Sequence, residues 1–187
     1  MAAVLLFSPA LQAQTAITSL SEITSASGNY VLAADIDASG FGGFSFTDDF
    51  TGTLDGGYHT ISGLRVPLFN TLNGATVKNL RLDNVNINRT GTNADAGAVC
   101  VTATGNTKVY NCGVLATTAS TVQGTRYVGG LVGAIGSGSN VRVVNCYNYA
   151  TVSGGTYAAG IVGYNQGTVS GTTTVNTTGV RIAMCMM

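Results

Sequence analysis

The only histidine of the chain, His59, lies four residues after Asp55 in the segment TLDGGYHTI. An Asp–His pair serves general acid–base catalysis when a nucleophile or a second carboxylate completes it. Asp83 is available as a second carboxylate, but no Ser, Cys or Glu forms a recognisable motif with the pair. The intervening Gly-Gly favours a tight turn in which the Asp accepts backbone hydrogen bonds. We interpret the segment as strand, turn and strand with a structural histidine, and expect no catalytic residues.

The segment DIDASG, residues 35–40, resembles the start of a calcium loop. The twelfth loop position, which requires Glu, is Phe46, so an EF-hand is excluded. A looser calcium site with Asp48 or Asp49 is the alternative to a pair of turn-forming aspartates. No Cys or His spacing resembles a zinc pattern, and the Gly-rich segments lack the Lys-Ser/Thr of a phosphate loop. We expect neither a metal nor a cofactor.

Tyrosines offer a pattern that suits a ligand. Tyr147 and Tyr149 have the period-two spacing that places both side chains on one face of a strand. Tyrosine combines an apolar ring with a polar hydroxyl, which suits stacking on sugars. Tyr157 and Tyr164 are further candidates for exposed rings. Contact of Tyr147 and Tyr149 with a glycan is our hypothesis; the alternative is that the tyrosines fill corners and flanks of the fold.

The charge composition excludes whole classes of partner. Charged residues are 9% of the chain and the formal net charge is zero, so there is no electrostatic footprint for nucleic acid or anionic lipid. All eight carboxylates precede residue 96. The charged residues after that point are Lys108, Arg126, Arg142 and Arg181.

Internal repeats indicate the architecture. YVGGLVG at 127–133 returns as YAAGIVG at 157–163, and NTKVYNC at 106–112 returns as NVRVVNC at 140–146. GATVKNL at 74–80 is a weaker copy of the second phrase. A period of roughly 30 residues is typical of a solenoid.

The residue types of the repeats indicate strands. Short runs of Val, Ile, Leu and Thr alternate with Gly, Asn and Ser, which form turns. We predict an all-β fold, a right-handed parallel β-helix (β-solenoid) of about four to five coils. Residues 29–180 would form this single domain.

Aligning the repeats gives four columns: two inward, one outward and one at a bend where Asn adopts left-handed dihedrals and forms a hydrogen-bonded ladder. In that order they are Val77, Val109 and Val143 (inward); Leu80, Cys112 and Cys146 (inward); Lys78, Tyr110 and Val144 (outward); Asn79, Asn111 and Asn145 (bend).

The cysteine column leaves two alternatives open. Cys112 and Cys146 would lie on adjacent coils about 4.8 Å apart, within reach of a disulfide in an exported chain. Leu80 in the same column favours buried free thiols instead.

The two ends differ from the repeats. Residues 1–13 are typical of a signal peptide without its usual Lys or Arg, as in a truncated start. In residues 14–28, the spacing of Ile17, Leu20 and Ile23 predicts a short amphipathic helix that caps the first coil. The apolar tail, residues 181–187, either folds over the last coil or marks the truncated end of a fragment.

Two groups of segments carry a family resemblance. GGLVG with VVNCYNYATVSG, then AGIVGYNQGTV, resembles the GLUG repeat of bacterial surface proteins, and YVLAADIDASG with FTGTLDGGYHTISGL resembles the coils that precede it. The resemblance covers residues 29–171, departing from the pattern at Ala98-Val99-Cys100. It implies a pectin-lyase-like right-handed β-helix without catalytic residues, in secreted or cell-surface proteins.

We therefore expect a non-catalytic exported module that acts as a stalk, adhesin part or accessory glycan-binding domain. Its partners would be glycans or other surface proteins, with no membrane span and with end-to-end self-association of uncapped coils. The alternative is a polysaccharide lyase or hydrolase, since this fold hosts such enzymes. A glycoside hydrolase needs two carboxylates across a groove, and the coils after residue 95 contain none.

Overall fold

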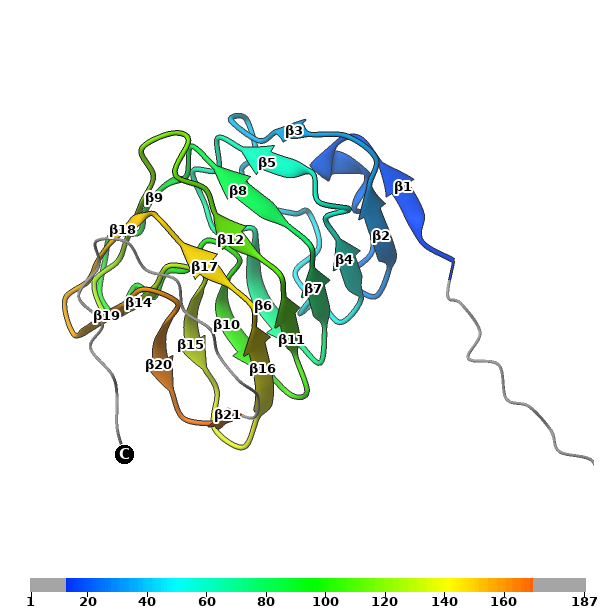
Figure 1. The fold of residues 1–187 in the computed structure, drawn as a ribbon. Helices are drawn as coiled ribbons and strands as arrows, with labels where there is room; N and C mark the ends of the chain where they lie inside the picture. Colours follow the sequence, from blue (N-terminus) through cyan, green and yellow to red (C-terminus); the bar gives the residue numbers. More distant parts are fainter. Residues whose placement is uncertain (1–12, 170–187) are drawn as a thin grey trace, which may run out of the picture.

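The computed structural model describes residues 13–169. This part is all-β, with strands in five sheets and parallel pairing throughout, apart from one three-residue 3₁₀ helix, η1 (Leu20–Glu22). The expectation of an all-β fold with parallel sheets is therefore confirmed. Figure 1 shows the strands of each sheet lying side by side along the length of the molecule.

We name the sheets A to E. Sheet A contains, in spatial order, β1 (Thr15–Ile17), β2 (Asn29–Leu32), β4 (Thr53–Asp55), β7 (Thr76–Lys78), β11 (Lys108–Tyr110), β16 (Asn140–Val144) and β21 (Thr168–Val169). Sheet B contains β3 (Ile36–Asp37), β5 (Thr60–Ser62), β8 (Arg81–Asp83), β12 (Gly113–Val114) and β17 (Tyr147–Asn148). Sheet C contains β6 (Phe69–Asn73), β10 (Cys100–Thr104), β15 (Val132–Ile135) and β20 (Val162–Asn165). Sheet D contains β9 (Asn86–Asn88), β13 (Thr121–Gln123) and β18 (Thr151–Ser153), and sheet E contains β14 (Tyr127–Gly129) and β19 (Tyr157–Ala159).

We call the stretch of chain between two visits to sheet A a circuit. From β11 onwards each circuit follows the order A, B, D, E and C, whereas the circuit from β4 visits only A, B and C. Tyr30 pairs with Leu54 and Leu54 with Val77, so the early circuits take 24 and 23 residues. Val77 pairs with Val109 and Val109 with Val143, so the later circuits take 32 and 34 residues. The additional residues form sheets D and E. In sheet D, β9 is an edge strand because the shorter circuits have no strand beside it.

The inward columns form the core. The columns that begin with Val77 and Leu80 are buried at every member, as predicted. Sulfur atoms lie in this core as free thiols at Cys100, Cys112 and Cys146. The Cys112 thiol donates to the carbonyl oxygen of Tyr110 at 3.1 Å, and burial raises the pKa of this thiol. The buried-thiol interpretation thus describes the structure.

The helix predicted in residues 14–28 is wrong. Residues 15–17 form a strand, in which Thr15 pairs with Tyr30, and the one helical turn is η1, with Ser19 as its N-cap. A spacing of three residues fits a 3₁₀ turn as well as an α-helix, and Ile17 has the extended backbone of sheet A. Ile17, Leu20 and Ile23 are nevertheless buried against the core.

The interpretations of residues 1–13 and 181–187 fall outside the described residues, apart from Ala13. Within residues 13–169, no helix has the length and apolar character needed to cross a membrane.

Candidate functional site

The segment that contains Asp55 and His59 is a tight turn. The backbone N–H of Gly57 donates to Asp55 Oδ1 at 3.0 Å, and the N–H of His59 donates to the carbonyl oxygen of Gly56 at 2.7 Å. Gly57 and Tyr58 both have positive φ, at 55° and 64°. The turn interpretation is therefore confirmed.

The carboxylate next to His59 is Asp35 rather than Asp83. His59 Nδ1 lies 3.3 Å from Asp35 Oδ1, which also accepts the backbone N–H of Thr60 at 2.8 Å. This backbone hydrogen bond lowers the pKa of Asp35. Asp83 instead accepts two hydrogen bonds from Thr118 in the next circuit. The Asp35–His59 pair could not be predicted from the sequence, because only the stacking of successive circuits brings its two members together.

Other acidic side chains accept hydrogen bonds within a turn or from the next circuit. Asp37 Oδ1 accepts the N–H of Ser39 at 2.8 Å, as expected of a turn-forming aspartate. Asp49 accepts from Asn73 Nδ2 at 3.4 Å. In the part of the chain between residues 13 and 169, no three His, Cys, Asp or Glu side chains come together as a metal-binding group.

An asparagine ladder forms the bend between sheets A and B. Asn79, Asn111 and Asn145 have positive φ of 52°, 51° and 52°, as predicted. Asn145 Nδ2 donates to Asn111 Oδ1 at 2.7 Å, Asn111 Nδ2 to Asn79 Oδ1 at 3.0 Å, and Asn79 Nδ2 to Asp55 Oδ1 at 3.0 Å. The ladder therefore runs in one direction and ends on a carboxylate.

Beside this ladder, the outward residues of sheet B form an uneven column. Register places Arg81, Gly113 and Tyr147 side by side in β8, β12 and β17. Gly113 has no side chain, and a Cβ atom at this position would lie 2.5 Å from the ring of Tyr147. The phenol ring therefore lies against the backbone of the preceding circuit, and burial raises the pKa of Tyr147.

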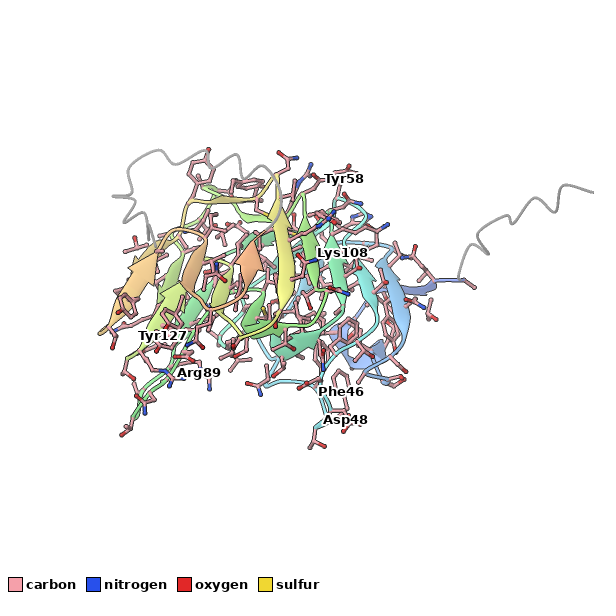
Figure 2. The ribbon with its side chains drawn as sticks, turned by 90° about the horizontal axis from the view of Figure 1, so that it is seen from below. Phe46, Asp48, Tyr58, Arg89, Lys108 and Tyr127 are labelled. Carbon is pink, nitrogen blue, oxygen red and sulfur yellow. The ribbon has the colours of Figure 1, made fainter. Side chains whose placement is uncertain are left out.

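These side chains enclose a hollow of about 280 Å³ that is lined by Tyr58, Arg81, Asn111, Asn145 and Tyr147. We call it the tyrosine hollow. Its members come from four successive circuits, which at about 4.8 Å per strand step span roughly 14 Å. Tyr58 is 58% exposed, and the guanidinium carbon of Arg81 lies 5.8 Å from the centre of its ring. Figure 2 shows Tyr58 on the opposite side of the molecule from Phe46 and Asp48.

Of the two tyrosines predicted to contact a glycan, Tyr147 lines the hollow and Tyr149 lies beside it. The ring centres of Tyr147 and Tyr149 are 6.0 Å apart with planes tilted by 58°, and Tyr149 is 40% exposed. Tyr58 and Arg81 were not predicted from the sequence. Arg81 could have been found from the repeat alignment, which places it in the same column as Gly113 and Tyr147.

The other exposed-tyrosine candidates pack on one another. Tyr164 stacks on Tyr127 at 4.2 Å between ring centres and on Tyr157 at 5.5 Å. Arg126 covers the Tyr127 ring at 4.6 Å and binds both oxygens of Asp95 at 2.7 and 2.6 Å. For Tyr157 and Tyr164, filling the flank of the fold is therefore the interpretation that fits the structure.

A second hollow, of about 340 Å³, lies where the circuits widen. We call it the phenylalanine cavity. One wall is the loop of residues 42–50, and Asn88 and Arg89 at the end of β9 form part of another. Phe44 stacks on Phe46 at 5.0 Å, and both pack against the core. This loop covers apolar surface that the short early circuits would otherwise leave open.

Comparison with known proteins supplies the family. Residues 17–115 match the family described as the M26 IgA1-specific metallo-endopeptidase N-terminal region, and they are more than half of the chain. The chain belongs to this family. The matched M26 N-terminal region includes Tyr58, Arg81 and Asn111 of the tyrosine hollow but ends before Asn145 and Tyr147.

Relatives of this M26-family chain include two streptococcal proteins. The immunoglobulin A1 protease of Streptococcus sanguinis is 36% identical over 135 residues, 63% of this chain and 7% of the relative. The immunoglobulin A1 protease of Streptococcus pneumoniae (strain ATCC BAA-255 / R6) is 37% identical over 161 residues, 74% of this chain and 8% of the relative. Halomucin of Haloquadratum walsbyi is 38% identical over 128 residues, 57% of this chain and 1% of the relative. The chain thus corresponds to a small part of each of these proteins.

Proposed function

We propose that the chain is a non-catalytic module of an exported bacterial surface protein and that it binds glycans through the tyrosine hollow. The circuits would form a right-handed parallel β-helix with GLUG-like repeats, with residues 29–180 as its single domain. The register supports the repeat alignment, since Tyr127 pairs with Tyr157 and Val132 with Val162. Membership of the M26 N-terminal family supports a place beside a catalytic domain rather than within it.

The observation that carries glycan binding is the composition of the tyrosine hollow. Two tyrosine rings, one guanidinium and two amides converge on a single concave surface. Rigid aromatic rings provide contact area at low conformational-entropy cost, and a few placed polar groups fix the orientation of a ligand. Sugars, which combine apolar ring faces with hydroxyl groups, match both features.

One observation keeps a polysaccharide lyase as the second candidate. Asp35 and His59 adjoin the hollow, because His59 follows Tyr58 in the chain and its carbonyl oxygen accepts the N–H of Arg81 at 3.2 Å. A base next to a cation is the pair that elimination from a uronate requires. Formation of an unsaturated uronate, followed by its ultraviolet absorbance and abolished by His59→Ala, would favour this candidate over simple binding.

The proposal is tested with the full chain on a glycan microarray. We expect selective binding that is lost in Tyr58→Ala and Tyr147→Ala. The matched control is Tyr157→Ala, which removes a tyrosine that is 49% exposed and outside the hollow, and it should bind normally. Absence of binding by a folded sample, or binding that survives loss of both hollow tyrosines, would contradict the proposal.

A further inference from the structure

The tyrosine hollow is rich in hydrogen-bond donors. Each asparagine of the ladder uses one N–H to reach the preceding circuit, while an amide nitrogen carries two hydrogens. Among residues 13–169, the second N–H of Asn111 and of Asn145 has no partner, so each amide has an N–H that can donate to a ligand. The oxygen of Asn111 already accepts from Asn145, so one of its two lone pairs is used within the ladder.

The charge of the hollow has one sign. Of the described residues that line it, Arg81 alone has a charged side chain, and none is a carboxylate. The acidic groups of the neighbouring circuits have other partners: Asp55 binds Lys78 Nζ at 3.1 Å and Asn79, and Asp35 binds His59 and the N–H of Thr60. Further along the stack, the chain contains no Asp or Glu after residue 95.

The ring of Tyr147 covers Gly113, so no side chain of β12 separates this ring from Arg81. Arg81 and Tyr147 are the outward neighbours of Gly113 in sheet B, on the circuits before and after it. A planar guanidinium binds a carboxylate through two parallel hydrogen bonds, and that of Arg81 lies in the same hollow as the rings of Tyr58 and Tyr147. A donor-rich, positively charged hollow between aromatic rings is complementary to a sugar that carries a carboxylate.

We infer that the tyrosine hollow selects carboxylate-bearing sugars, with Arg81 holding the carboxylate, Tyr58 and Tyr147 the ring, and Asn111 and Asn145 the hydroxyl oxygens. This inference rests on the proposed glycan binding. Uronic and sialic acids share the required chemistry, and separate probes distinguish them.

The experiment measures binding of the full chain by isothermal titration calorimetry with two matched pairs of probes. Trigalacturonic acid is compared with neutral galactotriose, and sialyllactose with lactose. A charged hydrogen-bond pair corresponds to about a tenfold or greater difference in affinity, so one acidic probe should bind at least about tenfold more tightly than its neutral partner. This preference should weaken as the salt concentration rises.

Two variants assign the preference to Arg81. Arg81→Gln should remove the difference between acidic and neutral probes, and Arg81→Lys, which keeps the charge but not the two parallel hydrogen bonds, should retain part of it. The matched control Arg89→Gln removes a cation next to the phenylalanine cavity and should keep the full preference. Circular dichroism checks that each variant is folded.

The outcomes separate the two proposals. Equal affinity for acidic and neutral sugars, or a preference that survives Arg81→Gln, overturns the acidic selectivity and leaves glycan binding in place. Absence of binding by every probe, together with an empty glycan array, overturns both.

Discussion

The early and later circuits share a backbone scheme but differ in their outward residues. Circuits of 24 and 23 residues place Asp35, Asp37 and Asp55 at their turns, where the carboxylates accept backbone N–H groups. At the bend that follows sheet A, where the early circuit has Asp55, the circuits of 32 and 34 residues have asparagine amides. Parallel stacking restricts the inward columns to apolar residues in both regions, whereas the outward columns are free to diverge and to carry function.

The largest expected effects are in the core, and they should be similar in the two regions. Leu54→Ala in an early circuit and Leu131→Ala in a later one each remove a fully buried side chain. Each should lower the free energy of unfolding by about 2–5 kcal/mol, measured by urea titration. The exposed control Gln123→Ala should change it by less than about 0.5 kcal/mol. A large cost in one region alone would show that the two regions unfold separately.

The next largest effect concerns the asparagine bend. Asn111→Ala removes the side-chain hydrogen bonds to both neighbouring circuits. It also leaves alanine at a φ of 51°, a left-handed conformation that the amide hydrogen bonds no longer stabilise. We expect a loss of about 1–3 kcal/mol in the free energy of unfolding. Asn111→Gly relieves the backbone conformation and should cost less. If both substitutions cost the same, backbone conformation contributes nothing at this bend.

Acid should destabilise the early circuits more than the later ones. Partial burial raises the pKa of Asp55, but hydrogen bonds from Gly57 and Asn79 and the Lys78 ammonium outweigh it, so the pKa is lowered overall. A lowered folded-state pKa stabilises the protein above the unfolded value of roughly 3.9, and this contribution is lost as the pH falls through the folded value.

We expect the urea midpoint to fall with acidification below about pH 5 and to fall less steeply in Asp55→Asn. Thr151→Ser, in a later circuit without carboxylates, should keep the wild-type slope. An unchanged slope in Asp55→Asn would remove Asp55 from the explanation of acid sensitivity.

The smallest expected effect is in the tyrosine stack of the later circuits. Tyr157 is 49% exposed and stacks on Tyr164 at 5.5 Å. Tyr157→Ala should lower the free energy of unfolding by about 0.5–1.5 kcal/mol, measured by urea titration. A larger loss would mean that this stack supports the later circuits more than its exposure indicates.

The repeated phrases of the sequence predicted the parallel pairing and the inward columns, because stacking demands the same residue type at the same position of each circuit. The Asn bend was predictable for the same reason. The N-terminal helix was not, since Ile17, Leu20 and Ile23 satisfy a strand followed by a 3₁₀ turn equally well. Neither the Asp35–His59 pair nor the hollow around Tyr58 was visible, because their members come from circuits of unequal length that only the folded register brings together.

The most direct test of the account follows the side-chain amide signals of Asn111 and Asn145 by NMR while an acidic oligosaccharide is added. We predict shifts of these amides and of the Arg81 side-chain N–H groups, with no response from Gly43 or Asn88 at the phenylalanine cavity. Shifts at Gly43 and Asn88 with silent Asn111 and Asn145 amides would contradict binding at the tyrosine hollow.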